Sequence, residues 1–187
     1  MLRRCSFFAL VCVLVLSTFL PGCCSDSAAE SSPPRTAIDA QPLVREDDFD
    51  RLIGTPWTGT LTYLDYTSMK SATIRSTLAV ARLPQSESGP AWDLRVGYND
   101  APHANSREAL VLLEGGRRLG TASVVERTLL AGGLVAIATE RQGEDDGQPA
   151  TLRHVYLLGA SECSIQNLVM LDDSDESFER NLYRWSR

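Results

Sequence analysis

The sequence predicts an all-β domain, an antiparallel up-and-down barrel of eight to ten strands, with a sandwich as the alternative arrangement of the same strands. Apolar and polar residues alternate along most of the segment 57–187, and a period of two is typical of strands that bury one face. Short Gly-rich or polar sequences separate these runs, as turns do in antiparallel sheets. No convincing amphipathic helix interrupts the pattern, so strands are expected to form the core.

The first predicted strands show the alternation most clearly. A short helical turn is expected within 46–54, just before them. The residues expected on one face of the first strand, 57–66, are Trp57, Gly59, Leu61 and Tyr63. The second strand, 72–83, places Ile74, Leu78 and Val80 together. In the third strand, 91–98, the residues that share a face are Trp92, Leu94, Val96 and Tyr98, so Arg95 lies on the opposite face.

The remaining strands are expected at 107–114, 117–130, 134–141, 150–159, 163–171 and 178–187. Gly115-Gly116 and Gly132-Gly133 predict hairpin turns, because glycine takes positive φ without strain. The acidic segments 142–149 and 172–176 predict loops. The second segment has carboxylates at alternating positions, but it lacks the glycine and the distant glutamate of an EF-hand calcium loop. Solvated turns are therefore the preferred interpretation.

The N-terminal residues differ from the rest of the chain. Met1 to Arg4 is short and basic, and the segment 7–20 is almost wholly apolar. A membrane-spanning helix needs about 20 apolar residues, whereas the apolar region of a secretory signal has roughly 7–15. Residues 1–22 are therefore interpreted as an export signal and not as part of the fold.

The end of this signal resembles the lipobox of bacterial lipoproteins, with Leu20, Pro21, Gly22 and Cys23 in order. The resemblance implies cleavage before Cys23, a diacylglyceryl group on its thiol, and an anchor in a membrane of the bacterial cell envelope. No aspartate follows Cys23, which favours the outer membrane, facing the periplasm. The alternative is ordinary secretion with cleavage after a small residue such as Ala29.

Residues 23–45 are rich in Ser, Ala, Pro and acidic residues and show no apolar periodicity. Such a segment cannot bury enough surface to order itself, so it predicts a lipidated, disordered tether before a barrel domain at 46–187. Once Cys23 carries lipid, Cys24 and Cys163 are the remaining cysteines of the mature chain. They either pair as a disulfide, or Cys163 stays a buried thiol.

Composition and motifs restrict the function classes. The formal net charge is −6, and the loss of Arg3 and Arg4 with the signal makes it more negative, which argues against nucleic acid as a partner. No nucleophile elbow, Cys/His pair or phosphate-binding glycine loop is recognisable. With only His103 and His154 as histidines, no metal site and no cofactor are expected, and an enzyme is the least supported hypothesis.

Gly54-Thr-Pro-Trp57, followed by Gly59, is similar to the opening of calycin or lipocalin-like barrels. In such barrels a tryptophan near the first strand closes one end and a basic residue from the last strand packs over it. The terminal sequence YRWSR offers Arg184 or Arg187 for that role. The resemblance therefore implies a lipocalin-like barrel with Trp57 at its closed end.

A barrel of this size either encloses a small-molecule cavity or fills its interior with side chains. The first hypothesis is a lipid-anchored binding protein for a small apolar or amphipathic ligand. Its expected contacts are Tyr63, Asp65, Trp92, Tyr98, His154 and Tyr156. The second hypothesis is an envelope protein with a filled barrel, whose outer surface docks a protein partner that the sequence does not identify.

Overall fold

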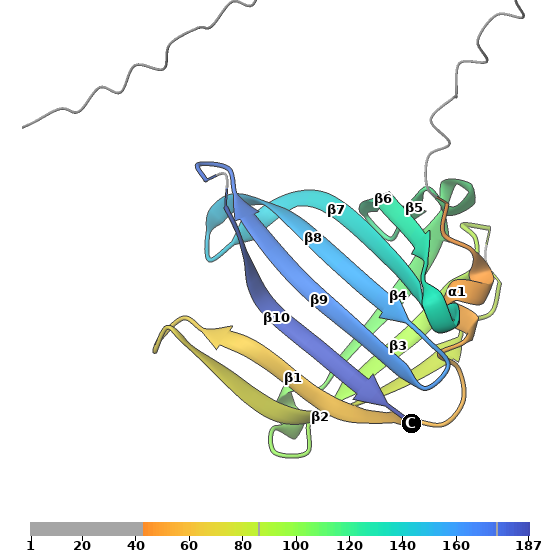
Figure 1. Cartoon of the computed structure of the whole chain (residues 1–187), viewed down its shortest axis with the longest axis horizontal. Coiled ribbons are helices and arrows are strands. Elements are labelled where there is room, and N and C mark those ends of the chain that lie inside the picture. Colours follow the sequence, from red (N-terminus) through yellow and green to blue (C-terminus); the bar gives the residue numbers. More distant parts are fainter. Residues whose placement is uncertain (1–42, 86, 175) are drawn as a thin grey trace, which may run out of the picture. The chain divides into compact units, whose positions relative to one another are not determined.

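The computed structural model describes residues 43–85, 87–174 and 176–187. The predicted signal, Cys23, Cys24 and most of the predicted tether lie outside these residues. Within them, ten strands form one closed antiparallel barrel in which each strand pairs with the next along the chain, and β1 pairs with β10 (Figure 1). This confirms the predicted all-β, up-and-down barrel and excludes the sandwich.

The strands have the following bounds: β1 Trp57–Asp65, β2 Lys70–Arg82, β3 Ala91–Gly97, β4 Ser106–Leu113, β5 Arg118–Leu119, β6 Ala122–Leu129, β7 Val135–Asp145, β8 Gln148–Leu158, β9 Glu162–Leu171 and β10 Ser177–Ser186. One α-helix, α1 (Glu46–Asp50), precedes them in the described part of the chain, and three 3-10 turns, Pro102–Ala104, Glu114–Gly116 and Ala131–Gly133, connect strands. The barrel closes where β1 meets β10, with a register that runs from Thr58 opposite Ser186 to Tyr63 opposite Asn181.

Two connections differ from the sequence prediction, and backbone conformation explains both. The expected strand 117–130 is divided into β5 and β6 at Gly120, whose φ of 58° turns the chain. The expected loop 142–149 is instead a tight hairpin, because Asp146 and Gly147 both take positive φ and allow Asp145 to pair with Gln148. An Asp-Gly pair is a favoured two-residue hairpin turn. The two predicted Gly-Gly turns have positive φ at all four glycines.

The helix α1 closes one end of the barrel. Its Phe49 is fully buried, with its ring centroid 5.2 Å from that of Trp92 on β3 and 5.7 Å from that of Tyr156 on β8. Val44, which the sequence analysis assigns to the tether, is also in this core, and its N–H donates to the carbonyl of Gly116. The core therefore begins before the helix.

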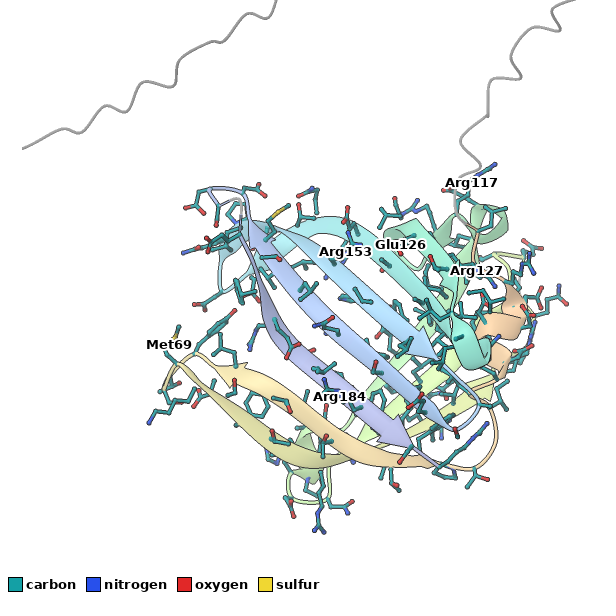
Figure 2. The ribbon with its side chains drawn as sticks, viewed as in Figure 1. Met69, Arg117, Glu126, Arg127, Arg153 and Arg184 are labelled. Atoms are coloured by element: carbon teal, nitrogen blue, oxygen red, sulfur yellow. The ribbon has the colours of Figure 1, made fainter. Side chains whose placement is uncertain are left out.

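Charged side chains of the barrel wall hold α1 in place. Arg82 of β2 donates to the carboxylates of Glu46 and Asp50, the latter at 2.5 Å. Arg127 of β6 donates to the buried Asp48, and Figure 2 shows Arg127 beside the helix.

Among the described residues, no helix has the length and hydropathy that a bilayer-spanning segment needs.

Candidate functional site

A cavity of about 140 Å³ lies inside the barrel. Because inward and outward side chains alternate along each strand, residues from β2, β3, β4, β8, β9 and β10 line it together. The apolar residues of the lining are Leu78, Leu94, Val96, Leu110, Ile165 and Trp185. The residues with polar groups are Ser106, Glu108, His154, Tyr156, Asn167 and Tyr183.

Hydrogen bonds and stacking fix the two aromatic side chains that β10 contributes to the cavity lining. Trp185 donates from Nε1 to the hydroxyl of the buried Ser76 on β2, at 3.0 Å. Tyr183 stacks on Trp185, with ring centroids 4.9 Å apart and planes inclined by 16°. The hydroxyls of Tyr183 and Tyr98 are 2.9 Å apart and share a hydrogen bond. These contacts give the cavity a rigid aromatic surface.

Burial shifts the pKa values of both tyrosines and of the histidine in the cavity lining toward their uncharged forms. Burial, and then the charge of Glu108, raise the pKa of Tyr156. Burial, the hydrogen bond with Tyr98 and the charge of Glu108 raise the pKa of Tyr183. Burial, and then the charge of Arg141, lower the pKa of His154. The cavity therefore presents two phenols and an uncharged imidazole at neutral pH.

Asn167 of β9 carries an unused acceptor. Its Nδ2 donates to Oδ1 of Asn181 at 2.6 Å. Its Oδ1 is buried and has no hydrogen-bond partner within the described residues. Buried polar atoms are nearly always paired in native proteins, with protein groups, water or a ligand. An unpaired amide oxygen beside a cavity therefore marks a position where a donor can bind.

Of the six ligand contacts expected from the sequence, three lie in or beside the cavity and three lie elsewhere. His154 and Tyr156 line the cavity, with the hydroxyl of Tyr156 3.4 Å from His154 Nδ1. Tyr98 reaches it through the hydroxyl of Tyr183. Tyr63 lies opposite Asn181 in the register, outside the cavity lining described above.

Trp92 and Asp65 lie at opposite ends of the barrel. Trp92 is fully buried under α1, and its Nε1 donates to Oδ1 of Asp50 at 2.8 Å. Asp65 accepts hydrogen bonds from the Thr67 N–H and the Ser68 hydroxyl, which fix the turn between β1 and β2. These two side chains have structural partners in place of cavity contacts.

Sequence reasoning missed Ser106, Glu108, Asn167 and Tyr183 as cavity residues. For two of them a signal was present. Glu108 is two and four residues from Leu110 and Leu112, so it shares their face of β4. Asn167 is likewise two residues from Ile165 and from Val169 on β9. A polar residue on the core face of a strand is therefore as good a candidate for a cavity lining as an aromatic residue.

The open end of the barrel, opposite α1, is held by a contact between hairpins. The hydroxyl of Tyr66, after β1, donates to the carboxylate of Asp145 at the end of β7. Arg180 of β10 lies over the Tyr66 ring, with Cζ 4.1 Å from its centroid. Met69, at the tip of the β1–β2 hairpin, is 69% exposed and projects away from the barrel (Figure 2).

At the other end, Trp57 is fully buried, and its Nε1 donates to the carbonyl of Leu52 at 2.9 Å. The guanidinium of Arg187 lies over its ring, with Cζ 4.2 Å from the centroid. Arg184 is exposed on β10 and points outward (Figure 2). Of the two arginines considered from the sequence, Arg187 is the one that packs over Trp57.

No protein-family model matches the chain, and no curated protein matches it. Within residues 43–85, 87–174 and 176–187, no group of three or more His, Cys, Asp and Glu side chains is placed to hold a metal ion. Cys163 is a buried free thiol, and burial raises its pKa to about 12.

Proposed function

We propose that the protein is a lipid-anchored binding protein of the bacterial cell envelope, whose lipocalin-like barrel holds a small apolar or amphipathic molecule. The observation that carries the proposal is the interior cavity, whose lining combines apolar side chains with hydrogen-bonding ones. Binding sites for small molecules are mostly apolar with a few convergent polar groups. The unpaired amide oxygen of Asn167 supports a bound molecule with a donor group.

The volume of the cavity limits the size of this ligand. Sites for drug-sized molecules have about 300–1,000 Å³, which is well above the 140 Å³ here. An apolar cavity of about 150 Å³ binds benzene. The ligand is therefore the size of a single ring or a short branched chain, or it inserts only one end.

The contact between Arg187 and Trp57 supports the lipocalin-like character of the barrel, since the same pairing is implied by the sequence resemblance. Helix α1 blocks that end, so the ligand enters from the end opposite α1. Tyr66, Asp145 and Arg180 define the rim there.

The N-terminal sequence supports the anchor, with acylation of Cys23 and a tether that leads to the outer membrane on its periplasmic side. The test is metabolic labelling with a fatty-acid analogue in the native host. The wild type and Cys24→Ser are expected to be labelled, and Cys23→Ser is expected to lose the label. Equal labelling of Cys23→Ser would contradict the anchor.

Native mass spectrometry of the protein from its own host tests the binding function. The wild type is expected to retain a small molecule, and Ile165→Trp, which fills the cavity, is expected to lose it while remaining folded. The proposal would be contradicted if the wild type is repeatedly isolated without any added mass and Ile165→Trp, which fills the cavity, does not differ from it in retained mass.

One observation favours the second hypothesis, docking of a protein partner on the outer surface. A shallow hollow of about 230 Å³ lies on the outside of β7 to β10 and includes Leu168 and Met170, the latter 40% exposed. A photo-reactive residue at position 170 would give one discrete cross-linked product in cells if this surface docks a partner, whereas the same residue at position 58, also exposed, would not.

A further inference from the structure

We propose that the cavity is selective for a small organic cation, a protonated amine attached to one apolar ring or short chain. This inference rests on the proposed binding function and names the chemical class of the ligand. It follows from the charge of the cavity wall, the hydrogen-bonding capacity of that wall and the aromatic surface beside it.

The cavity wall carries one formal charge, the carboxylate of Glu108. Among the described residues that line the cavity, none is Lys or Arg, and within the described part of the chain no ion pair or hydrogen bond engages Glu108. Glu108 lies in the same lining as Tyr156 and Tyr183, and after burial its charge contributes to raising the pKa of each phenol. An amine would therefore meet a carboxylate that has no protein counter-ion.

Arg141 is the basic residue that acts on the cavity histidine, and its side chain is directed away from the lining. Arg141 faces inward on β7 and affects the pKa of His154. Its Nη1, however, lies 2.8 Å from the position that a Cβ on Gly143 would occupy. The guanidinium is thus directed along β7 toward the open end, and Arg141 is absent from the cavity lining described above.

The hydrogen-bonding groups of the lining also favour a donor-rich ligand. The carboxylate of Glu108 only accepts hydrogen bonds, and Asn167 Oδ1 is an acceptor without a partner. The donor of that amide, Nδ2, is already used by Asn181. An ammonium group has three N–H donors and no acceptor, so it suits a lining whose free groups, Glu108 and Asn167 Oδ1, both accept.

The aromatic residues complete the match. A cation is attracted to the face of tryptophan or tyrosine within about 6 Å of the ring centroid, and Tyr183 and Trp185, which stack on each other, both belong to the cavity lining. The same surface packs well against an apolar ring. A carboxylate ligand would instead lie close to Glu108 with no cation to pair with, which disfavours it.

The test is calorimetric titration of the barrel with three probes of one size: benzylammonium, benzyl alcohol and benzoate, at neutral pH and low salt. We expect benzylammonium to bind about ten-fold more tightly than benzoate, with benzyl alcohol between them. Added salt should reduce the advantage of the ammonium, because Glu108 lies at the solvent-exposed side of the cavity and such pairs are screened.

The variant Glu108→Gln tests whether Glu108 causes the preference for a cation. This variant should weaken benzylammonium binding about three- to five-fold and leave benzyl alcohol binding unchanged. Glu179→Gln is the matched control, because Glu179 is exposed on the outer face of β10, where it accepts from Gln166. The control should bind all three probes like the wild type.

Each result has a definite meaning. Equal affinity for benzylammonium and benzyl alcohol, or no effect of Glu108→Gln, would overturn the cation selectivity while the binding function stands. Failure of all three probes to bind would overturn both. Tighter binding of benzoate would replace the cation by an anion as the ligand class and would also overturn the inference.

Discussion

Arg127 of β6 donates two hydrogen bonds, each 2.8 Å long, to the carboxylate of Asp48 on α1, which is fully buried. The N–H of Arg45 donates to the same carboxylate at 2.8 Å. Arg127 itself is only 16% exposed. This bidentate pair joins the helix that closes the barrel to the barrel wall, and geometry of this kind is specific to arginine.

Arg127→Met is expected to lower the free energy of unfolding by about 3 kcal/mol, because the buried Asp48 carboxylate loses its bidentate partner and keeps the Arg45 N–H at 2.8 Å and the Arg51 guanidinium at 3.8 Å. Urea denaturation measures this. The double variant Asp48→Asn/Arg127→Met should recover part of the loss. Arg118→Met, which breaks an exposed pair with Glu114, should cost less than about 1 kcal/mol. Equal effects of the two single variants would contradict the role of the buried pair.

The Asp48 pair also predicts a dependence of stability on acid pH. Burial alone would raise the pKa of Asp48, but the hydrogen bonds from Arg127 and Arg45 and the charge of Arg127 lower it below 3.8. The unfolded chain then binds this proton first as the pH falls. The stabilisation is present above the usual pKa and is lost as the pH falls through the lower folded value. The difference between wild type and Arg127→Met, measured by urea denaturation from about pH 6 to pH 2, should therefore shrink in acid.

Arg187 is expected to stabilise the closed end through its planar guanidinium. Besides covering Trp57, it donates to the carbonyls of Arg51, Ile53 and Ala160. Arg187→Lys should lower the melting temperature, and it should lower the free energy of unfolding by about 1–2 kcal/mol. Arg184→Lys, on the same strand but facing outward, should change it by less than about 0.5 kcal/mol. The opposite ranking would show that Arg187 does not have this role.

His154 is expected to stay neutral in the folded protein below the usual imidazole pKa of 6.5, because burial and then the charge of Arg141 lower its pKa. Between the folded value and 6.5 the unfolded chain holds more protons, so stability decreases as the pH falls through this window. NMR titration of the imidazole signal in untagged protein measures the pKa, and His103→Gln leaves one histidine to observe. His154→Gln should remove this part of the pH dependence. A midpoint at or above 6.5 would contradict the prediction.

Gly59 is expected to allow the close approach of β1 and β10. A Cβ at this position would lie 1.9 Å from the carbonyl oxygen of Arg184, an atom of the neighbouring backbone. Gly59→Ala must displace one strand and should cost about 1–3 kcal/mol in urea denaturation. Thr58→Ala, at an exposed neighbour, should cost about 0.5 kcal/mol or less. A neutral Gly59→Ala would show that the two strands can separate at no cost.

The strands were predictable because each is specified by its own short sequence. Alternation assigned Trp92, Leu94 and Val96 to one face, and all three point inward. It also placed His154 and Tyr156 on the same face, and both line the cavity. The sequence left Arg184 and Arg187 open for the contact with Trp57, and the structure places Arg187 there.

The tertiary structure alone decided what meets across the barrel. A period of two states which side a residue faces, but the closure of β1 on β10 and the register of distant strands set which inward residues meet. Glu108, His154 and Asn167 come together from three strands, and Asp48 meets Arg127 over 79 positions of sequence. The sequence by itself therefore determined the barrel and its inward faces, whereas the cavity, its charge and its closed end arise from long-range pairing that no local pattern encodes.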